Sequence, residues 1–300
     1  MKNIKVEEIC GFLDKEGSGY EYLGNRDAEI HDFSNLQELS DAVTCWVKDK
    51  KYLSEDVVAR LHEVKDVLVV APFVIAGVNC LVTDYPKGVF FSILNHFFAA
   101  PFPHTISERA SVLTDAIGKN VHIGPNCYVG PEVSIGDNTI LHPNVVIDCP
   151  CTIGKNCELF AGVVIGADGF GYYKDDDGVP HREIHYKGVI IGDNVEIGAN
   201  SCVDRGLLTD TVIGDNVKID NLCHVGHNVR IDENCLIIAG NVICGSANIG
   251  RNAYLSPQCL VFNQVDVGAK ATIGASSVAM FDVKPEITVF GNPARRLSPR

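Results

Sequence analysis

Residues 213–278 read IGDNVKIDNLCHVGHNVRIDENCLIIAGNVICGSANIGRNAYLSPQCLVFNQVDVGAKATIGASSV, and this stretch decides the fold. An aliphatic residue returns there at every sixth position: Ile213, Ile219, Val225, Ile231, Ile237, Ile243, Ile249, Leu255, Val261, Val267 and Ile273. A helix requires a period near 3.6 and a two-faced strand a period of 2, so a strict six predicts the hexapeptide repeats of a parallel β-helix. Three hexads make one coil of about 18 residues, and side chains 18 positions apart should therefore stack.

The remaining hexad positions agree with this prediction. The fifth position is small, as a narrow interior requires: Val217, Cys223, Val229, Cys235, Ala247, Ala253, Cys259, Val265, Ala271 and Ser277. Asn recurs at the fourth position, and Asn tolerates the left-handed backbone that coil corners need. Asn228 occupies this position, so we predict that it is a turn residue first.

Hexads also occur upstream, from Ile117 to Ile165 and from Ile191 to Val203, with two interruptions. Residues 166–188 form a Gly- and Asp-rich excursion, GADGFGYYKDDDGVPHREIHYKG, and the spacing between Val203 and Ile213 is ten instead of six. Loops that leave a regular solenoid are commonly where function is placed. The repeat is thus the predicted scaffold, and the two interruptions are candidates for the site.

The domain organisation follows from where the hexads begin and end. Residues 1–105 lack them and should form a small α/β domain with helices at 54–64 and 87–99. The mainly β domain covers residues 106–282. Pro285 and Pro293 argue against a further coil, so residues 283–300 are expected to be a C-terminal capping arm.

Composition excludes several classes of protein. The net charge of −13, without a concentrated basic run, argues against a nucleic-acid partner. The start is acidic and no apolar run approaches ~18 residues, so no membrane span and a cytoplasmic location are expected. Half of the twelve cysteines occupy the small inward position, and none forms a CxxC pair, which predicts free thiols and no metal.

Two histidines are the candidates for chemistry. His224 and His227 lie in IDNLCHVGHNVRI at positions that point away from the interior, next to the ten-residue spacing. Gly245 lies 18 positions after His227, so its backbone N–H should be one coil away. A base and an oxyanion donor at that separation would suit acyl transfer.

The N-terminal domain contains a pair of aromatics, Trp46 and Tyr52, with charged residues between them. Both aromatics could belong to a core. The alternative is a platform on which a nucleobase stacks.

The segments IGADGFGYY, IGDNVEIGANSCVDRGLLTDTVIGDNVKIDN and the HN of VGHNVRI resemble the UDP-3-O-acylglucosamine N-acyltransferases of lipid A synthesis. The resemblance spans about residues 106–280. It implies a left-handed β-helix, a homotrimer with active sites between subunits, and a nucleotide-binding N-terminal domain. It also implies that His227 is the general base, that Gly245 supplies the oxyanion amide, and that His224 is secondary.

Three departures from that family concern the substrates. The family's Phe-x-x-Asn-Pro-Lys-Tyr uridine pattern appears here with Trp46, Asp49 and Tyr52, which makes these three the candidate nucleotide contacts. A second family histidine aligns with Gln264. The chain ends in VFGNPARRL, similar to CoA-dependent sugar acetyltransferases, so Gln264, Arg295 and Arg296 are the candidate acyl-donor contacts.

The predicted function is transfer of a short acyl group, acetyl or a small 3-hydroxyacyl, from acyl-CoA to the amino group of a dTDP- or UDP-linked amino sugar. No permanently bound cofactor is expected. The alternative is the lipid A enzyme itself, with an acyl carrier protein as donor. A zinc lyase similar to γ-type carbonic anhydrases would need a third histidine ligand, which the sequence does not evidently offer, and a non-catalytic scaffold would leave the paired histidines unexplained. The departing thiolate could replace His227 as the proton acceptor.

Overall fold

The computed structural model describes residues 3–100 and 102–296. The chain divides into two compact units, residues 1–101 and residues 102–300, and each is described here by itself. Within the described residues no helix has the length and apolar character needed to cross a bilayer.

The first unit is built on a five-stranded sheet of order β2–β7–β6–β5–β4, in which only β2 runs antiparallel to its neighbour. Alternate residues of the central strands point to opposite faces, so one face packs on α1 and α3 and the other on α2. The elements are β1 (Ile4–Lys5), α1 (Val6–Lys15), β2 (Glu21–Leu23), β3 (Glu29–Ile30), β4 (Asp32–Phe33), β5 (Val43–Trp46), a 3₁₀ turn (Lys50–Tyr52), α2 (Glu55–Glu63), β6 (Leu68–Ala71), β7 (Asn79–Val82) and α3 (Pro86–Phe97).

The predicted helices at 54–64 and 87–99 are confirmed by α2 and α3. The Ser54 hydroxyl accepts a hydrogen bond from the backbone N–H of Val57 and caps α2. The prediction missed α1, although its buried residues, Val6, Ile9, Cys10 and Leu13, recur with helical spacing.

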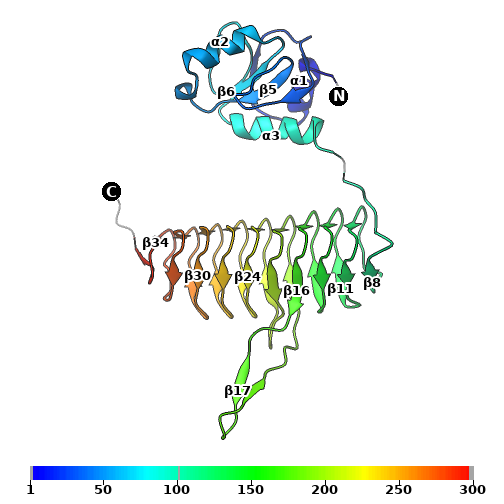
Figure 1. Cartoon of the computed structure of the whole chain (residues 1–300), viewed down its shortest axis with the longest axis vertical. Coiled ribbons are helices and arrows are strands. Elements are labelled where there is room, and N and C mark those ends of the chain that lie inside the picture. The colour runs from blue at the N-terminus through cyan, green and yellow to red at the C-terminus, as the bar shows by residue number, and fades with distance from the viewer. Residues whose placement is uncertain (1–2, 101, 297–300) are drawn as a thin grey trace. The chain divides into compact units, whose positions relative to one another are not determined.

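The second unit is a left-handed parallel β-helix, which confirms the predicted fold class. Its strands follow one another as successive coils in Figure 1. The nine-stranded sheet contains β8 (Ser111–Val112), β10 (Tyr128–Val129), β13 (Val146–Ile147), β16 (Val164–Ala167), β21 (Cys202–Asp204), β24 (His224–Val225), β27 (Val242–Ile243), β30 (Leu260–Val261) and β33 (Val278–Ala279).

Two further sheets complete the prism. The seven-stranded sheet contains β11 (Val133–Ile135), β14 (Cys151–Ile153), β19 (Val189–Ile191), β22 (Thr211–Ile213), β25 (Arg230–Ile231), β28 (Asn248–Ile249) and β31 (Asp266–Val267). The ten-stranded sheet contains β9 (His122–Ile123), β12 (Ile140–Leu141), β15 (Glu158–Leu159), β20 (Glu196–Ile197), β23 (Lys218–Ile219), β26 (Leu236–Ile237), β29 (Tyr254–Leu255), β32 (Thr272–Ile273), β34 (Thr288–Phe290) and β35 (Arg295–Arg296).

The interior and the corners follow the hexad pattern. The periodic aliphatic residues and the small fifth-position residues are buried in one continuous core. The fourth-position asparagines adopt positive φ, as at Asn126 (61°) and Asn228 (61°). Several of them also bond along the axis: Asn120 donates to Asn138, and Asn138 to Asn156, at 3.1 Å each. Asn is therefore favoured at the corners both by its backbone tolerance and by its side-chain amide.

Two insertions change the register between coils. The 166–188 excursion contains a hairpin, β17 (Tyr172–Lys174) and β18 (Pro180–Arg182), which leaves the stack in Figure 1. The ten-residue spacing after Val203 makes Cys202 pair with His224, 22 positions on, instead of with a residue 18 positions on. The interruptions thus bring together residues that the simple repeat rule keeps apart.

The C-terminal segment differs from the predicted capping arm. Thr288 pairs with Thr272, 16 positions earlier, and Val283 forms a bridge with Val267, so a shortened coil continues through Pro285. Pro285 is tolerated because the hydrogen bonds to the preceding coil are made by nearby residues and need no N–H from proline. The N–H of Gly268 donates to Val283 O, and the N–H of Glu286 donates to Ala269 O. Residues 297–300 lie outside the described part of the chain.

Candidate active site

A cavity of about 420 Å³ opens beside His227 on the outer surface of the β-helix. Its lining includes both candidate histidines and Gly245, together with Asp204 and Gln264. His224 lies at the start of β24, and His227 lies at the corner that follows this strand; both are half-buried. The structure thus brings together four of the predicted site residues and adds Asp204 to them.

The imidazole of His227 is held by the residue that follows it. The Oδ1 atom of Asn228 lies 2.8 Å from Nδ1 of His227. The Nδ2 atom of Asn228 donates to the backbone carbonyl of Thr209 at 2.8 Å, and a carbonyl can only accept, so the amide orientation is fixed. Nδ1 therefore carries the hydrogen and Nε2 keeps a free lone pair. Asn228 is the predicted turn residue and also orients the base, a role that the sequence did not show.

Gly245 lies directly against that free nitrogen. A Cβ atom built on Gly245 would lie 2.6 Å from Nε2 and 2.8 Å from Cε1 of His227, closer than real contacts allow. Within the described residues, the backbone N–H of Gly245 has no hydrogen-bond acceptor. A residue that can accept a proton and a residue with an unused N–H donor therefore lie next to each other in the lining of one cavity, a combination that suits acyl transfer.

The 166–188 excursion packs on the opposite side of His227. A Cβ atom on Gly169 would lie 2.6 Å from Cδ2 of His227 and 2.7 Å from Nε2 of His185. The His185 ring is buried and packs edge-to-face on His227, with ring centroids 5.1 Å apart. Phe170, 90% exposed, borders the cavity. Sequence pointed to this loop as a whole but did not identify Gly169 or His185.

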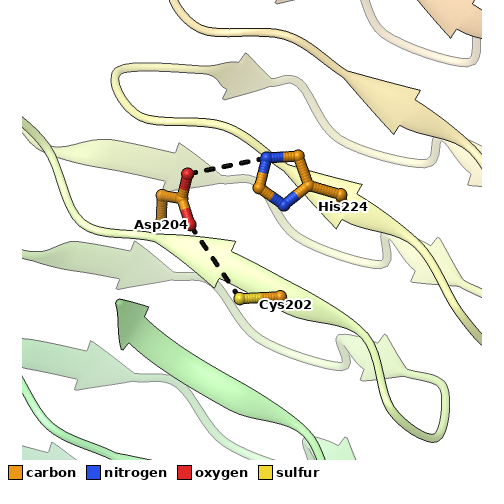
Figure 2. Close-up of side chains that lie close together, drawn as sticks. All are labelled: Cys202, Asp204 and His224. Atoms are coloured by element: carbon orange, nitrogen blue, oxygen red, sulfur yellow. Dashed lines mark hydrogen bonds and ion pairs between the residues drawn. The ribbon is translucent and has the colours of Figure 1, made fainter. Parts of the chain in front are cut away.

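Asp204 is the charged residue at the base of the cavity, and Figure 2 shows His224 and Cys202 directed toward it. Burial raises the pKa of the Asp204 carboxyl, and electrostatic attraction to His224, His227 and His185 offsets part of that rise. Burial, together with the Asp204 charge, raises the pKa of the neighbouring Cys202 thiol to about 11. The sequence located Asp204 only within the VDRG of the irregular spacing, without a role.

The charge of Asp204 should support activity at the expense of stability. A carboxyl whose pKa is raised on folding contributes stability at low pH that is lost as the pH rises through the folded-state pKa. At neutral pH, Asp204→Asn should therefore unfold at the same or a higher temperature. The variant should also lose about tenfold in kcat, because roughly 1.4 kcal/mol of charge stabilisation at the transition state is tenfold in rate.

Thermal unfolding by circular dichroism and steady-state kinetics check this expectation. Asp148→Asn is the matched control, because Asp148 follows a strand of the same sheet but is exposed. A lower melting temperature combined with unchanged kcat would assign Asp204 a purely structural role.

The predicted nucleotide contacts separate into two kinds. Trp46 and Tyr52 line a cavity of about 780 Å³ within the first unit, together with Phe33, Phe91 and other residues. Asp49 does not line this cavity. Its carboxylate instead accepts a hydrogen bond from the backbone N–H of Lys51 at 3.0 Å and caps the 3₁₀ turn that carries Tyr52. A direct contact of Asp49 with the nucleotide stays a prediction, and the structure adds that its carboxylate caps this turn.

The predicted donor contacts also lie apart. Gln264 lines the cavity beside His227. Arg295 and Arg296 line a different cavity of about 330 Å³ at the last coils, with Lys284. The sequence grouped these residues by resemblance, whereas the structure places the arginines several coils further along the axis.

Comparison with known families agrees with this geometry. The profile of the bacterial transferase hexapeptide family (six repeats) matches residues 116–149 and 210–245, and that of the hexapeptide repeat of succinyl-transferase matches residues 188–221. A solved UDP-N-acetylglucosamine acyltransferase from Bacteroides fragilis superposes with a TM-score of 0.58 and 28% identity, over 64% of this chain and 74% of that chain. Fold and site therefore define a hexapeptide-repeat acyltransferase of the left-handed β-helix class.

Curated relatives identify the family within this class of acyltransferases. A UDP-3-O-acylglucosamine N-acyltransferase from Campylobacter lari is 36% identical over 294 residues, covering 91% of this chain and 87% of that protein. The chain belongs to the UDP-3-O-acylglucosamine N-acyltransferase family. A probable mitochondrial member from Arabidopsis thaliana is 40% identical, and that alignment covers 48% of this chain and 47% of the relative. For this relative and for one from a Caulobacter strain (42% of its length), the match spans less than half of the relative.

Proposed function

We propose that the protein transfers a 3-hydroxyacyl group to the amino group of UDP-3-O-acylglucosamine, the reaction of lipid A synthesis. One observation carries the chemistry: His227, whose Nε2 makes no hydrogen bond, and Gly245, whose N–H is unused, are adjacent and line the same cavity. The names of the relatives support the amino sugar, and the Campylobacter alignment extends over both units of the chain. This proposal takes up the alternative prediction, in place of short-chain acyl transfer from CoA to a dTDP- or UDP-linked amino sugar.

The steps follow from the two groups. The neutral amine attacks the thioester carbonyl, and a C–N bond forms as the carbonyl oxygen takes up negative charge. The Gly245 N–H stabilises that oxyanion, and Nε2 of His227 accepts the amine proton. The C–S bond then breaks, and the proton passes from His227 to the departing thiolate sulfur.

A donor assay tests the proposal. Purified protein is given UDP-3-O-(3-hydroxyacyl)glucosamine with either the acyl carrier protein thioester or the matching acyl-CoA, and product is followed by mass spectrometry. We expect diacylated sugar nucleotide with the carrier protein. Activity confined to acetyl-CoA and another nucleotide amino sugar would reject the proposal.

CoA remains the second candidate donor because of the basic cavity at the end of the β-helix. Lys284, Arg295 and Arg296 supply three cations there, and guanidinium groups suit phosphate oxygens. The same assay with Arg295→Ala separates the two donors: a raised KM for acyl-CoA alone would favour CoA.

The cavity of the first unit is proposed to hold the nucleobase. Stacking on an aromatic side chain contributes roughly 1–3 kcal/mol, so Trp46→Ala or Tyr52→Ala should raise the KM for the sugar nucleotide about tenfold. Tyr85→Ala is the control, because Tyr85 is 71% exposed and outside this cavity. Unchanged KM in both test variants would show that these aromatics only pack within the first unit and do not bind the nucleobase.

A homotrimer and a cytoplasmic location remain predictions. Exposed apolar side chains on the excursion, including Phe170, Ile184 and Tyr186, support association of copies through this segment. Sedimentation equilibrium of the purified protein tests the trimer directly.

A further inference from the structure

Three side chains of metal-ligand type converge beside the cavity, and two of them, Asp204 and His224, line it. Cys202 and His224 are direct partners in the register between β21 and β24. Asp204 follows two positions after Cys202, and the intervening Val203 is buried in the interior, so both ligand-type residues lie on the outer face. The ligand atoms of Cys202, Asp204 and His224 all lie within 4.8 Å of one another. Figure 2 shows the three side chains close together.

The imidazole–carboxylate distance in this cluster is longer than a direct hydrogen bond, and the thiol of Cys202 donates to Asp204 in a long sulfur hydrogen bond. Nε2 of His224 lies 3.5 Å from Oδ2 of Asp204, and Sγ of Cys202 lies 3.9 Å from Oδ1. Two other imidazole–carboxylate pairs of this chain close to 2.7 Å, His142 with Glu158 and His181 with Asp175. Tetrahedral zinc with bonds of 2.0–2.3 Å holds its ligand atoms roughly 3.3–3.8 Å apart. The 3.5 Å between His224 and Asp204 falls within that range, and the 3.9 Å between Cys202 and Asp204 lies just above it.

Two further observations point to a cation. Asp204 is only 5% exposed, and a buried carboxylate is costly unless charge and hydrogen bonds compensate it. Of the twelve cysteines, ten are buried and only Cys202 and Cys244 are half-exposed. Both half-exposed thiols lie at this site, but only Cys202 belongs to the cluster.

We propose that Cys202, Asp204 and His224 bind one Zn²⁺ ion. The thiolate, carboxylate and imidazole supply three ligands of the types that zinc prefers, and two of the three, Asp204 and His224, also line the cavity. Binding releases the thiol proton of Cys202 to solvent and changes no other bond. An ion at this place occupies the base of the cavity that the acyl acceptor must enter, so Zn²⁺ should slow acyl transfer. Only this kinetic consequence rests on the proposed function.

Metal binding is measured on the full-length, tag-free protein after removal of metals with a chelator. Titration with Zn²⁺ should give one ion per chain, and titration with Co²⁺ should give a thiolate-to-cobalt charge-transfer band in the near ultraviolet. Cys202→Ser should abolish the band and weaken binding at least about 100-fold, since changes even outside the ligand shell weaken metal sites 10–100-fold.

Cys244→Ser is the matched control, because Cys244 borders the same cavity without joining the cluster. It should keep both the band and the stoichiometry, with melting temperatures checking that both variants fold. No bound Zn²⁺, a cobalt spectrum without the thiolate band, or equal losses in the two variants would overturn the proposal.

The kinetic consequence is tested with the same variants. Zn²⁺ should lower kcat of the wild-type protein and of Cys244→Ser, with recovery on adding chelator, and should leave Cys202→Ser unaffected. If no acyl-transfer activity is found, the proposed function fails while the binding titrations still decide the metal site.

Discussion

Replacing His227 by asparagine should lower kcat by about 10²–10⁴-fold while KM for both substrates stays near the wild-type value. The reason is the free Nε2 lone pair, which Asn228 secures by accepting the Nδ1 hydrogen at 2.8 Å. Asparagine has similar volume but no basic nitrogen, so the β-helix should remain folded while proton transfer is lost. Steady-state kinetics from pH 6 to 9 measure the effect.

His224→Asn is the informative comparison for this variant. His224 lines the same cavity but lies on β24 with its ring toward Asp204, so its replacement should cost less than that of His227. Near-normal kcat of His227→Asn across the whole pH range would show that the departing thiolate takes the amine proton.

Adding one methyl group at Gly245 should lower kcat by about 10²-fold. The new Cβ would lie 2.6 Å from Nε2 of His227, so the ring must move, and a displacement of about 1 Å can cost 10²-fold. The ring cannot shift freely, because Asn228 is itself bonded to Thr209 at 2.8 and 2.7 Å. The backbone of Gly245 is not in the left-handed region, so alanine introduces no conformational strain there.

Kinetics and thermal unfolding of Gly245→Ala test this expectation. Gly19→Ala is the control, since a Cβ on Gly19 meets no atom within 4 Å. The double variant with His227→Asn should lose little beyond the single His227 variant, because both changes act through one imidazole. Fully multiplicative losses would contradict that account.

The rule that residues 18 positions apart stack on successive coils correctly placed Gly245 beside His227, because the repeat is uninterrupted after Ile213. Between His227 and Gly245 nothing is inserted, and the backbone N–H of Ser246 donates to His227 O at 2.9 Å, one coil on. The same arithmetic would have paired His224 with Gly206. The structure pairs it with Cys202, because the extra residues between Val203 and Ile213 bulge outward and the next coil resumes its register afterwards.

The orientation of single side chains was also beyond the sequence. From the sequence, Asn228 was explained by the corner pattern alone. The structure shows that its amide donates to Thr209 O, which directs its Oδ1 atom to Nδ1 of His227. Asp49 is a candidate nucleotide contact by resemblance, and only the structure showed that its carboxylate also accepts a hydrogen bond from Lys51 N–H in the 3₁₀ turn. In each case the contact depends on backbone conformation at a turn, which residue type constrains only weakly.

The sequence by itself determined the β-helix, its inward residues, the outward His227 and the loops that interrupt the coils. The reason is that the period of six is local: the residue types within each hexad identify its inward and corner positions. Only the tertiary structure decided which residues the interruptions bring together: Asp204 with Cys202 and His224, and Gly169 with His185 and His227. The physical reason is that an inserted loop can return to the stack only where the ladder hydrogen bonds and the buried aliphatic row resume. The register across the loop is therefore fixed by closure of the whole coil and not by the spacing of any residue pair.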